Sequence, residues 1–297
     1  MKYPSRASRL LPFQRVLGRP LRARSEHVFQ RMTLGRGFIR SIVNPALCAF
    51  IVLLFSPSVR ATTVVALIDG YHHRVVVAAD SLLIHKVAGT STQSCKIIAK
   101  PGCTFGMAGL FHKEYPAFDL QELAEQACGV SGDLRHKADR FLDIAKDPVM
   151  TVAQYLQQNE PQFYGELTNS NGGEFVIVVF AGMEAGNSSI FARGYKLDGN
   201  GGIGPVSLDV TENNAGVGFF GGANGQIASY IKAHPSWQQM DKVAAARKFV
   251  QMEIAAHPRW VGPPVSVVTI DRLDQQKWNN PGVCTVLPGQ QGSQKKH

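Results

Sequence analysis

Two consecutive threonines, Thr62 and Thr63, stand directly after the segment "SPSVRA", which ends at Ala61. A threonine hydroxyl is a poor nucleophile unless a base removes its proton. An N-terminal threonine carries that base itself, because its free α-amine has a pKa of about 7.7 to 8.0, close to neutral pH. A cut between Ala61 and Thr62 would therefore give Thr62 the amine that it needs to act as a nucleophile in acyl transfer.

The residues before Thr62 have the parts of a secretory signal. A basic segment that includes Arg36 and Arg40 precedes the apolar run "ALCAFIVLLF" at 46–55, and Val59 and Ala61 occupy the small-residue positions of a cleavage site. We expect leader removal and export to the periplasm or the extracellular space. Two alternatives stay open, an uncleaved membrane anchor and an Arg-rich organelle transit peptide. The length of the leader leaves both Met1 and Met32 open as the start of translation.

Charge is concentrated in that leader. Of the 31 Lys and Arg, 11 precede Thr62, together with one of the 22 acidic residues, so 20 basic residues face 21 acidic ones from Thr62 onward. The body of the protein therefore lacks the basic excess typical of nucleic-acid binding, and we expect no nucleic-acid partner.

Four motifs after Ala61 resemble the start of a proteasome-type β subunit, a threonine member of the N-terminal nucleophile (Ntn) hydrolases. They are "TTVVALID", "AADS", "CKIIAK" and "FGMAGL". The resemblance implies that Thr62 is the nucleophile and its amine the general base. It also implies that Asp80 and Lys96 set the protonation and orientation of Thr62, and that the Gly109 N–H donates to the oxyanion.

Elementary electrostatics supports these roles. A lysine near the amine disfavours protonation of that amine and keeps it a base, while an ion pair with Asp80 would hold Lys96 in place. Leu83 and Met107 lie near the positions where the family shapes its specificity pocket, which indicates apolar substrate side chains. Taken singly, an Asp after a strand, a Lys in a strand and a Thr-Thr pair are ordinary structural residues; their joint order behind a cleavage site favours the functional interpretation.

The second half of the chain departs from the family. Active subunits carry a serine in a Gly-Ser-Gly turn, where this chain has "FFGGAN" with Gly221 at the serine position. They also carry an Asp and a Ser before the final strand, where this chain has "HPRWVGPPVS". His257 and Ser266 are the candidates to substitute for these groups. The departure leaves open a catalytically inactive, proteasome-like binding or scaffold protein.

Metal and cofactor sites are not expected. Of five cysteines, Cys48 lies in the leader, and the other four allow three disulfide pairings that the sequence leaves open. The histidines show no zinc-site spacing. A formal dinucleotide fingerprint at Gly216, Gly218 and Gly221 lacks a parallel βαβ context, so it is a weak signal and we expect no cofactor.

The element pattern is two β hairpins, two helices, a β hairpin, two helices and a strand. β-rich runs occur at 62–69, 71–81, 95–100, 103–110, 174–182, 188–197, 206–210 and 263–272. Helical periodicity covers 114–129, with Gly129 as a stop, and 134–158, with an interruption at Asp147-Pro148. A further helix follows the glycine-rich turn at 216–225, and another covers 239–256. This order predicts an α+β fold in which two antiparallel sheets lie between helix pairs, the four-layer αββα sandwich of the Ntn hydrolases.

We therefore expect a removed leader at 1–61, an Ntn-hydrolase domain at 62–278 and a flexible tail at 279–297. The predicted activity is cleavage of peptide bonds by acyl transfer to Thr62, activated by leader removal; an amidase or acylase acting on small amides is the alternative. The expected partner is a peptide or small-amide substrate, and assembly into a homo-oligomer stays open. An ATP-dependent unfoldase is not expected for an exported protein.

Overall fold

The computed structural model of the chain describes residues 62–84, 91–170, 172–198, 202–212 and 218–284. The predicted leader with Ala61, and the residues after Cys284, lie outside these ranges. The described residues form a mixed α/β structure whose two large sheets are antiparallel and five-stranded. None of the described helices combines the length and the apolar character that a membrane span requires.

The first sheet is built around the strand that begins at Thr63. Its strand order is β12-β1-β2-β13-β14. The strands are β1 (Thr63–Asp69), β2 (Arg74–Ala79), β12 (Gly218–Gly222), β13 (Ser266–Ile270) and β14 (Gln276–Asn280). Every residue of β1 is buried, as expected for a β-branched run that is covered on both faces.

The second sheet has the order β11-β10-β9-β6-β5. Its strands are β5 (Ile97–Lys100), β6 (Cys103–Gly109), β9 (Glu174–Glu184), β10 (Asn187–Leu197) and β11 (Ile203–Thr211). Two short pairs add to the structure: β3 (Leu82–Ile84) with β4 (Ser91–Gln93), and β7 (His112–Lys113) with β8 (Phe118–Asp119).

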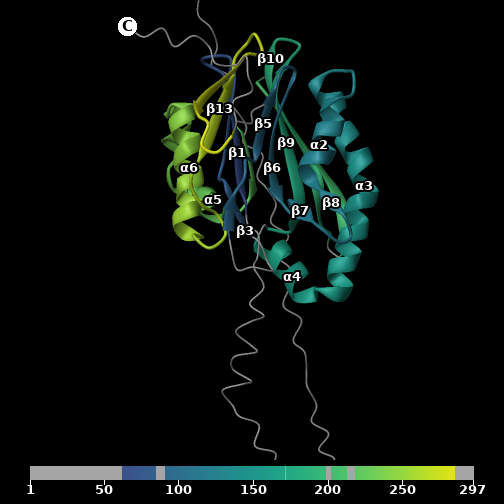
Figure 1. Cartoon of the computed structure of the whole chain (residues 1–297). Coiled ribbons are helices and arrows are strands. Elements are labelled where there is room, and N and C mark those ends of the chain that lie inside the picture. Colours follow the sequence, from purple (N-terminus) through teal and green to yellow (C-terminus); the bar gives the residue numbers. More distant parts are fainter. Residues whose placement is uncertain (1–61, 85–90, 171, 199–201, 213–217, 285–297) are drawn as a thin grey trace, which may run out of the picture. The chain divides into compact units, whose positions relative to one another are not determined.

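Aspartates begin three of the helices. Asp119, Asp133 and Asp241 accept backbone N–H groups from the first turns of α2, α3 and α6, which would otherwise be unpaired. The helices are α2 (Leu120–Cys128), α3 (Leu134–Asn159), α4 (Pro161–Ser170), α5 (Gly225–Ala233) and α6 (Lys242–Ala256), with a 3₁₀ turn at Pro235–Gln239. Helix α6 contacts β1 and β2, and α3 contacts β9 and β10 (Figure 1).

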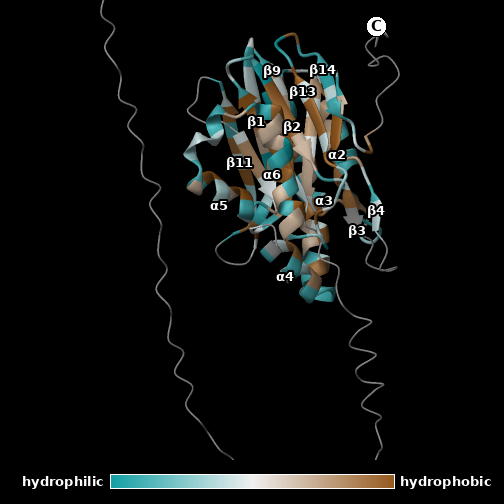
Figure 2. Ribbon diagram, turned by 90° about the vertical axis from the view of Figure 1, so that its left-hand side faces the viewer, coloured by the Kyte–Doolittle hydropathy of each residue, from teal (hydrophilic) through white to brown (hydrophobic). Residues whose placement is uncertain are grey.

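Three large clusters of buried apolar side chains in the described residues follow from this packing. One lies between α2, α3 and the second sheet, one joins residues of the two sheets, and one lies between the first sheet and helices α5 and α6. Figure 2 shows the hydrophobic colour gathered on the strands, β9 and β13 among them. Gly106 permits close approach of the sheets, because a Cβ there would lie 2.7 Å from Val64 Cγ2 of β1.

The helix predicted to break at Asp147-Pro148 is continuous. Pro148 lies inside α3, which runs from Leu134 to Asn159. A proline inside a helix costs about 3 kcal/mol. On both sides of it, Phe141, Val149 and Leu156 are fully buried, and each such side chain contributes about 1.5–3 kcal/mol. Burial of the helix face therefore outweighs the local penalty.

The predicted start of the tail at Asn279 is too early. Strand β14 continues to Asn280, and Cys284 forms a disulfide with Cys95. The second disulfide joins Cys103 to Cys128. The sequence pattern also missed α4, β14 and the two short strand pairs, whose few residues carry little periodicity.

Candidate active site

Thr62 lies beside a buried lysine. Thr62 is 3% exposed, and Lys96 Nζ donates a hydrogen bond to Thr62 Oγ1 over 3.2 Å. The same Nζ donates to Asp80 Oδ2 at 2.8 Å. Burial lowers the pKa of Lys96, and the attraction of Asp80 opposes that shift. The structure thus brings together Thr62, Asp80 and Lys96: Lys96 lies 34 residues after Thr62 and 16 residues after Asp80 in the sequence.

The Asp80 carboxylate is held by backbone donors as well as by Lys96. Oδ1 accepts the Thr63 N–H at 2.9 Å, and Oδ2 accepts the N–H groups of Leu82 at 3.1 Å and Gly262 at 3.3 Å. Charge-assisted hydrogen bonds of this kind fix a carboxylate in one orientation. Asp80 therefore presents a rigid partner to Lys96.

Strand register explains the convergence. Val64 pairs with Ala79, so Asp80, one residue further, lies opposite Thr63. Lys96 immediately precedes β5 in the facing sheet, and the Met107 N–H of β6 donates to its carbonyl. The β-branched runs that form β1 and β2 therefore set the spacing between the two threonines and the Asp80 carboxylate.

Gly222, the last residue of β12, and the next residue, Ala223, hold the two threonines in place. We call these two residues the clamp. The Thr62 carbonyl accepts the Ala223 N–H at 2.9 Å, and Thr63 Oγ1 donates to the Ala223 carbonyl at 2.9 Å. Gly222 lies against Thr62 with φ at +75°, and a Cβ there would be 1.7 Å from the Thr62 carbonyl oxygen. Gly222, rather than Gly221, is thus the β12 residue that touches Thr62, and it has no room for a side chain.

Gly109, the predicted oxyanion donor, is the last residue of β6. Its φ is +94°, and a Cβ would lie 2.3 Å from the Phe175 carbonyl oxygen, so only glycine fits. The Cβ of the preceding Ala108 is 3.2 Å from the position that a Cβ of Gly222 would take. The end of β6 therefore lies beside the residue that touches Thr62.

Of the two residues predicted to bind substrate, the structure describes the side chain of Met107 but not that of Leu83. Met107 is fully buried, in the cluster beneath α2 and α3, and in this structure it offers no surface to a substrate. Leu83 belongs to β3 and pairs with Thr92, but its side chain lies outside the described residues.

The residues considered as substitutes for the missing serine and aspartate have other partners. Ser266 Oγ donates to the Pro281 carbonyl at 2.9 Å, and His257 Nε2 lies 3.6 Å from Glu253 Oε2. Of the dinucleotide fingerprint, Gly218 and Gly221 lie within β12, which pairs with β1, while Gly216 lies outside the described residues. Within the described ranges no group of three or more His, Cys, Asp or Glu could hold a metal ion.

Sequence reasoning missed four residues of this site: Gly222, Ala223, Gly262 and Glu174. Three of them act through the backbone, which leaves no side-chain pattern to find. Glu174 is the first residue of β9, and its Oε2 accepts the Gly222 N–H at 2.7 Å. Burial raises the pKa of Glu174 to about 7, although the Gly222 N–H and the positive charge of Lys196 act in the opposite direction.

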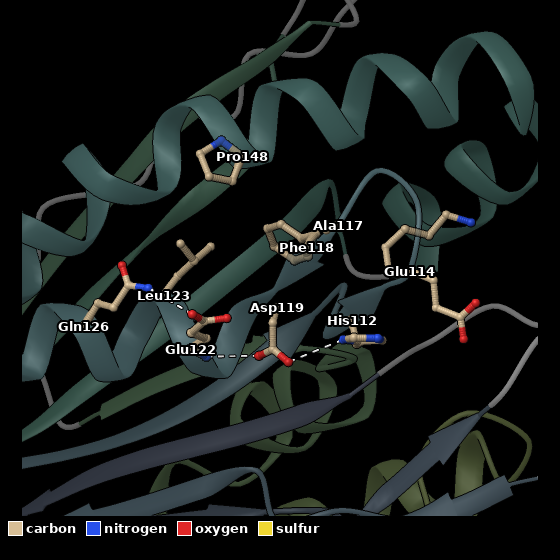
Figure 3. A pocket seen from close by; sticks show the side chains of 10 residues that line it. His112, Glu114, Ala117, Phe118, Asp119, Glu122, Leu123, Gln126 and Pro148 are labelled. Carbon is tan, nitrogen blue, oxygen red and sulfur yellow. Dashed lines mark hydrogen bonds and ion pairs between the residues drawn. The ribbon is translucent and has the colours of Figure 1, made fainter.

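A separate surface pocket lies at the start of α2. His112, Glu114, Asp119 and Glu122 are among the residues that line it (Figure 3). Its polar groups are engaged locally: Asp119 lies 3.3 Å from His112 Nδ1 and accepts the Glu122 N–H at the helix start. The pocket shares no residue with the Thr62 site.

Comparisons with known proteins give matches among the solved structures. No protein-family model matches this chain, and neither does any curated protein. A solved structure described as the Anbu (Gly-1) mutant from Hyphomicrobium sp. strain MC1 is 14% identical to this chain, and the match covers 73% of this chain and 86% of that one. The TM-score of that match is 0.39.

Proposed function

We propose that this chain is an exported Ntn hydrolase with a four-layer αββα architecture, which cleaves amide bonds by acyl transfer to Thr62. The observation that carries the proposal is the contact of Lys96 Nζ with Thr62 Oγ1 at 3.2 Å, made by a lysine that is itself paired with Asp80. A fully buried lysine and carboxylate are costly to place, and a hydroxyl at their meeting point is the arrangement that an activated nucleophile needs.

Removal of the leader would give Thr62 a free α-amine. That amine takes the Oγ1 proton as the oxygen attacks the substrate carbonyl, and the Lys96 N–H stabilises the negative charge that develops on Oγ1. The Gly109 N–H receives the oxyanion of the tetrahedral intermediate, a contact worth about 2.7–4 kcal/mol in comparable sites.

The α-amine, now protonated, then gives its proton to the leaving amine as the carbon–nitrogen bond breaks. This leaves an acyl ester on Thr62. Water, deprotonated by the same amine, attacks the ester; the acid is released and the Thr62 hydroxyl is restored. One amide bond and one water are consumed, and an acid and an amine are formed.

Export is supported by the two disulfides, which persist in oxidising compartments. We propose a peptide as substrate, on the strength of the resemblance of the first motifs to a peptidase family; a small-amide acylase is the alternative. The proposal leaves assembly into a homo-oligomer open and includes no ATP-dependent unfoldase.

A second candidate is a non-catalytic binding or scaffold protein. The observation that favours it is Gly222: β12 touches Thr62 with a residue that cannot carry the hydroxyl of active subunits. The two candidates share the fold and differ in whether Thr62 reacts.

The deciding experiment combines N-terminal sequencing of the exported protein with a threonine-directed epoxyketone, read by intact mass. We expect a chain that begins at Thr62 and one covalent adduct per chain. Thr62→Ala should abolish the adduct and Thr62→Ser should keep it, with the fold of both unchanged by circular dichroism. A mature chain that begins upstream of Thr62, or one that is correctly cut and never modified, would refute the enzyme and leave the binding protein.

A further inference from the structure

Glu174 connects the two sheets at the end where Thr62 lies. Its strand, β9, belongs to the second sheet, and Gly222, whose N–H it accepts at 2.7 Å, belongs to the first. The carboxylate is largely buried, and a buried carboxylate is retained at a cost unless its hydrogen bonds are made. The contact therefore fixes the last residue of β12 from outside its own sheet.

Glu174 reaches Thr62 through two backbone groups. Gly222 lies in contact with the Thr62 carbonyl, and the next residue, Ala223, donates to that carbonyl and accepts the Thr63 hydroxyl. A displacement of Gly222 together with Ala223 would move the Ala223 N–H and the Ala223 carbonyl, which hold both threonines. Gly222 thus contacts both the Glu174 carboxylate and Thr62.

The same end of β9 also positions the predicted oxyanion donor. Gly109 pairs with Val176, and the Leu110 N–H donates to the Phe175 carbonyl at 2.9 Å. The first three residues of β9 therefore contact both sides of the site, the glycine of β6 and the clamp of β12.

The charges around Glu174 leave it able to change protonation near neutral pH. Lys196 of β10 stands opposite it in the strand pair, and β12 faces it with the Gly222 N–H. Lys96, the buried cation of the site, is already engaged with Asp80 and Thr62. Desolvation by burial is the largest influence, and it raises the pKa of Glu174 to about 7.

We propose that Glu174 is a positioning residue for the Thr62 nucleophile, and that its carboxylate provides from the facing sheet the polar support that β12 cannot provide at Gly222. The inference rests on the function proposed above. A carboxylate accepts a hydrogen bond more strongly than a neutral carboxyl does. Protonation of Glu174 therefore loosens the clamp and slows the reaction of Thr62.

The first test measures the rate of epoxyketone addition to the mature protein between pH 5.5 and 9. We expect Glu174→Leu to react about tenfold more slowly at pH 8, the effect of one lost hydrogen bond. Glu174→Gln keeps an oxygen acceptor but no titration, so it should react at a rate between those of the wild type and Glu174→Leu. It should also lack the decrease in reaction rate that the wild type shows below pH 7.

The matched control is Glu184→Gln, because Glu184 is the last residue of the same strand. Its reaction rate and pH profile should be those of the wild type. If Glu174→Gln keeps the wild-type profile, the carboxylate of Glu174 is not the group that titrates and the proposal is wrong.

A second test does not depend on catalysis. Amide hydrogen exchange at Gly222 and Ala223, followed by NMR and corrected for intrinsic rates, should be at least about tenfold faster in Glu174→Leu than in the wild type. Glu184→Gln should show no change. An unreactive wild type with lost protection in Glu174→Leu would refute the proposed hydrolase and leave the positioning intact. Unchanged protection at both amides would overturn the positioning, whatever the activity; if the leucine variant does not fold, the pH profile of Glu174→Gln decides.

Discussion

The Lys96 ammonium lies 2.8 Å from the Asp80 carboxylate, and both side chains are wholly shielded from solvent. A buried ion pair is not stabilising in itself, because each charge loses several kcal/mol of hydration. Here three backbone N–H groups and the Thr62 hydroxyl complete the hydrogen bonding of the pair. We infer that the pair is retained for its effect on Thr62 more than for stability.

Removal of both members of this pair should cost less stability than the sum of the two single removals. Lys96→Met leaves a buried carboxylate without its cation, and Asp80→Asn leaves a buried ammonium, so each should cost about 3–5 kcal/mol. The double variant should lose clearly less than the sum of the two. Urea unfolding measures these free energies, and additive losses would show that the two groups are not coupled. Epoxyketone addition should be lost in all three variants.

Gly222→Ala should be severely destabilising. The new Cβ would lie 1.7 Å from the Thr62 carbonyl oxygen, and the φ of +75° is unfavourable for any residue but glycine. The clashing atom belongs to the backbone, so it cannot rotate away as a side chain could. We therefore expect the free energy of unfolding to fall by several kcal/mol, or Thr62 to be displaced with loss of reactivity. The control is Gly225→Ala in α5, where a Cβ meets nothing within 4 Å and alanine should add about 0.5–1 kcal/mol. Comparable urea midpoints in the two variants would contradict this geometry.

The sequence was informative where side chains carry the pattern. The runs "TVVALID" and "RVVVAA" form β1 and β2, and the lengths of the turns between them place Asp80 opposite Thr63. What could not be predicted depends on backbone groups and long-range register. The Gly262 N–H donates a hydrogen bond to Asp80 across 182 residues of sequence, and no residue type in the sequence indicates such a backbone donor.

The missed contribution of Glu174 has the same origin. A glutamate at the start of a strand is ordinary until the fold places it against Gly222, 48 residues later. The disulfide pairing is similar: Cys95 and Cys284 are separated by 189 residues, and four cysteines allow three pairings. The helix through Pro148 shows the reverse case, in which a strong local signal yields to burial of the surrounding side chains.

Glu174 should make the protein less stable as the pH rises from about 4.5 to about 7. The folded protein keeps a proton on this carboxyl up to about pH 7, whereas the unfolded chain, with an ordinary value of 4.5, releases it earlier. The folded state therefore binds more protons in this window, and the free energy of unfolding falls by about 3 kcal/mol across it.

Glu174→Gln removes this titration. Relative to the wild type it should gain about 3 kcal/mol of stability between pH 4 and pH 8, as measured by urea unfolding at several pH values. Parallel stability curves for the two proteins would show that Glu174 is not shifted. A gain in stability above pH 7 together with slower reaction of Thr62 would mean that the charged carboxylate serves the site at the expense of the fold.

Loss of the Cys95–Cys284 disulfide should affect both stability and reactivity. Its loop of 189 residues is much longer than the 25-residue separation of Cys103 and Cys128. In the chain-entropy account the long loop is worth about 5 kcal/mol and the short one about 3.5 kcal/mol. Cys95 also immediately precedes Lys96, so its release frees the segment that carries the buried ammonium. We expect Cys95→Ser/Cys284→Ser to lose more stability in urea and more epoxyketone reactivity than Cys103→Ser/Cys128→Ser. Equal reactivity of the two double variants, each measured where it is fully folded, would show that Lys96 is held by Asp80 and β6 without help from the disulfide.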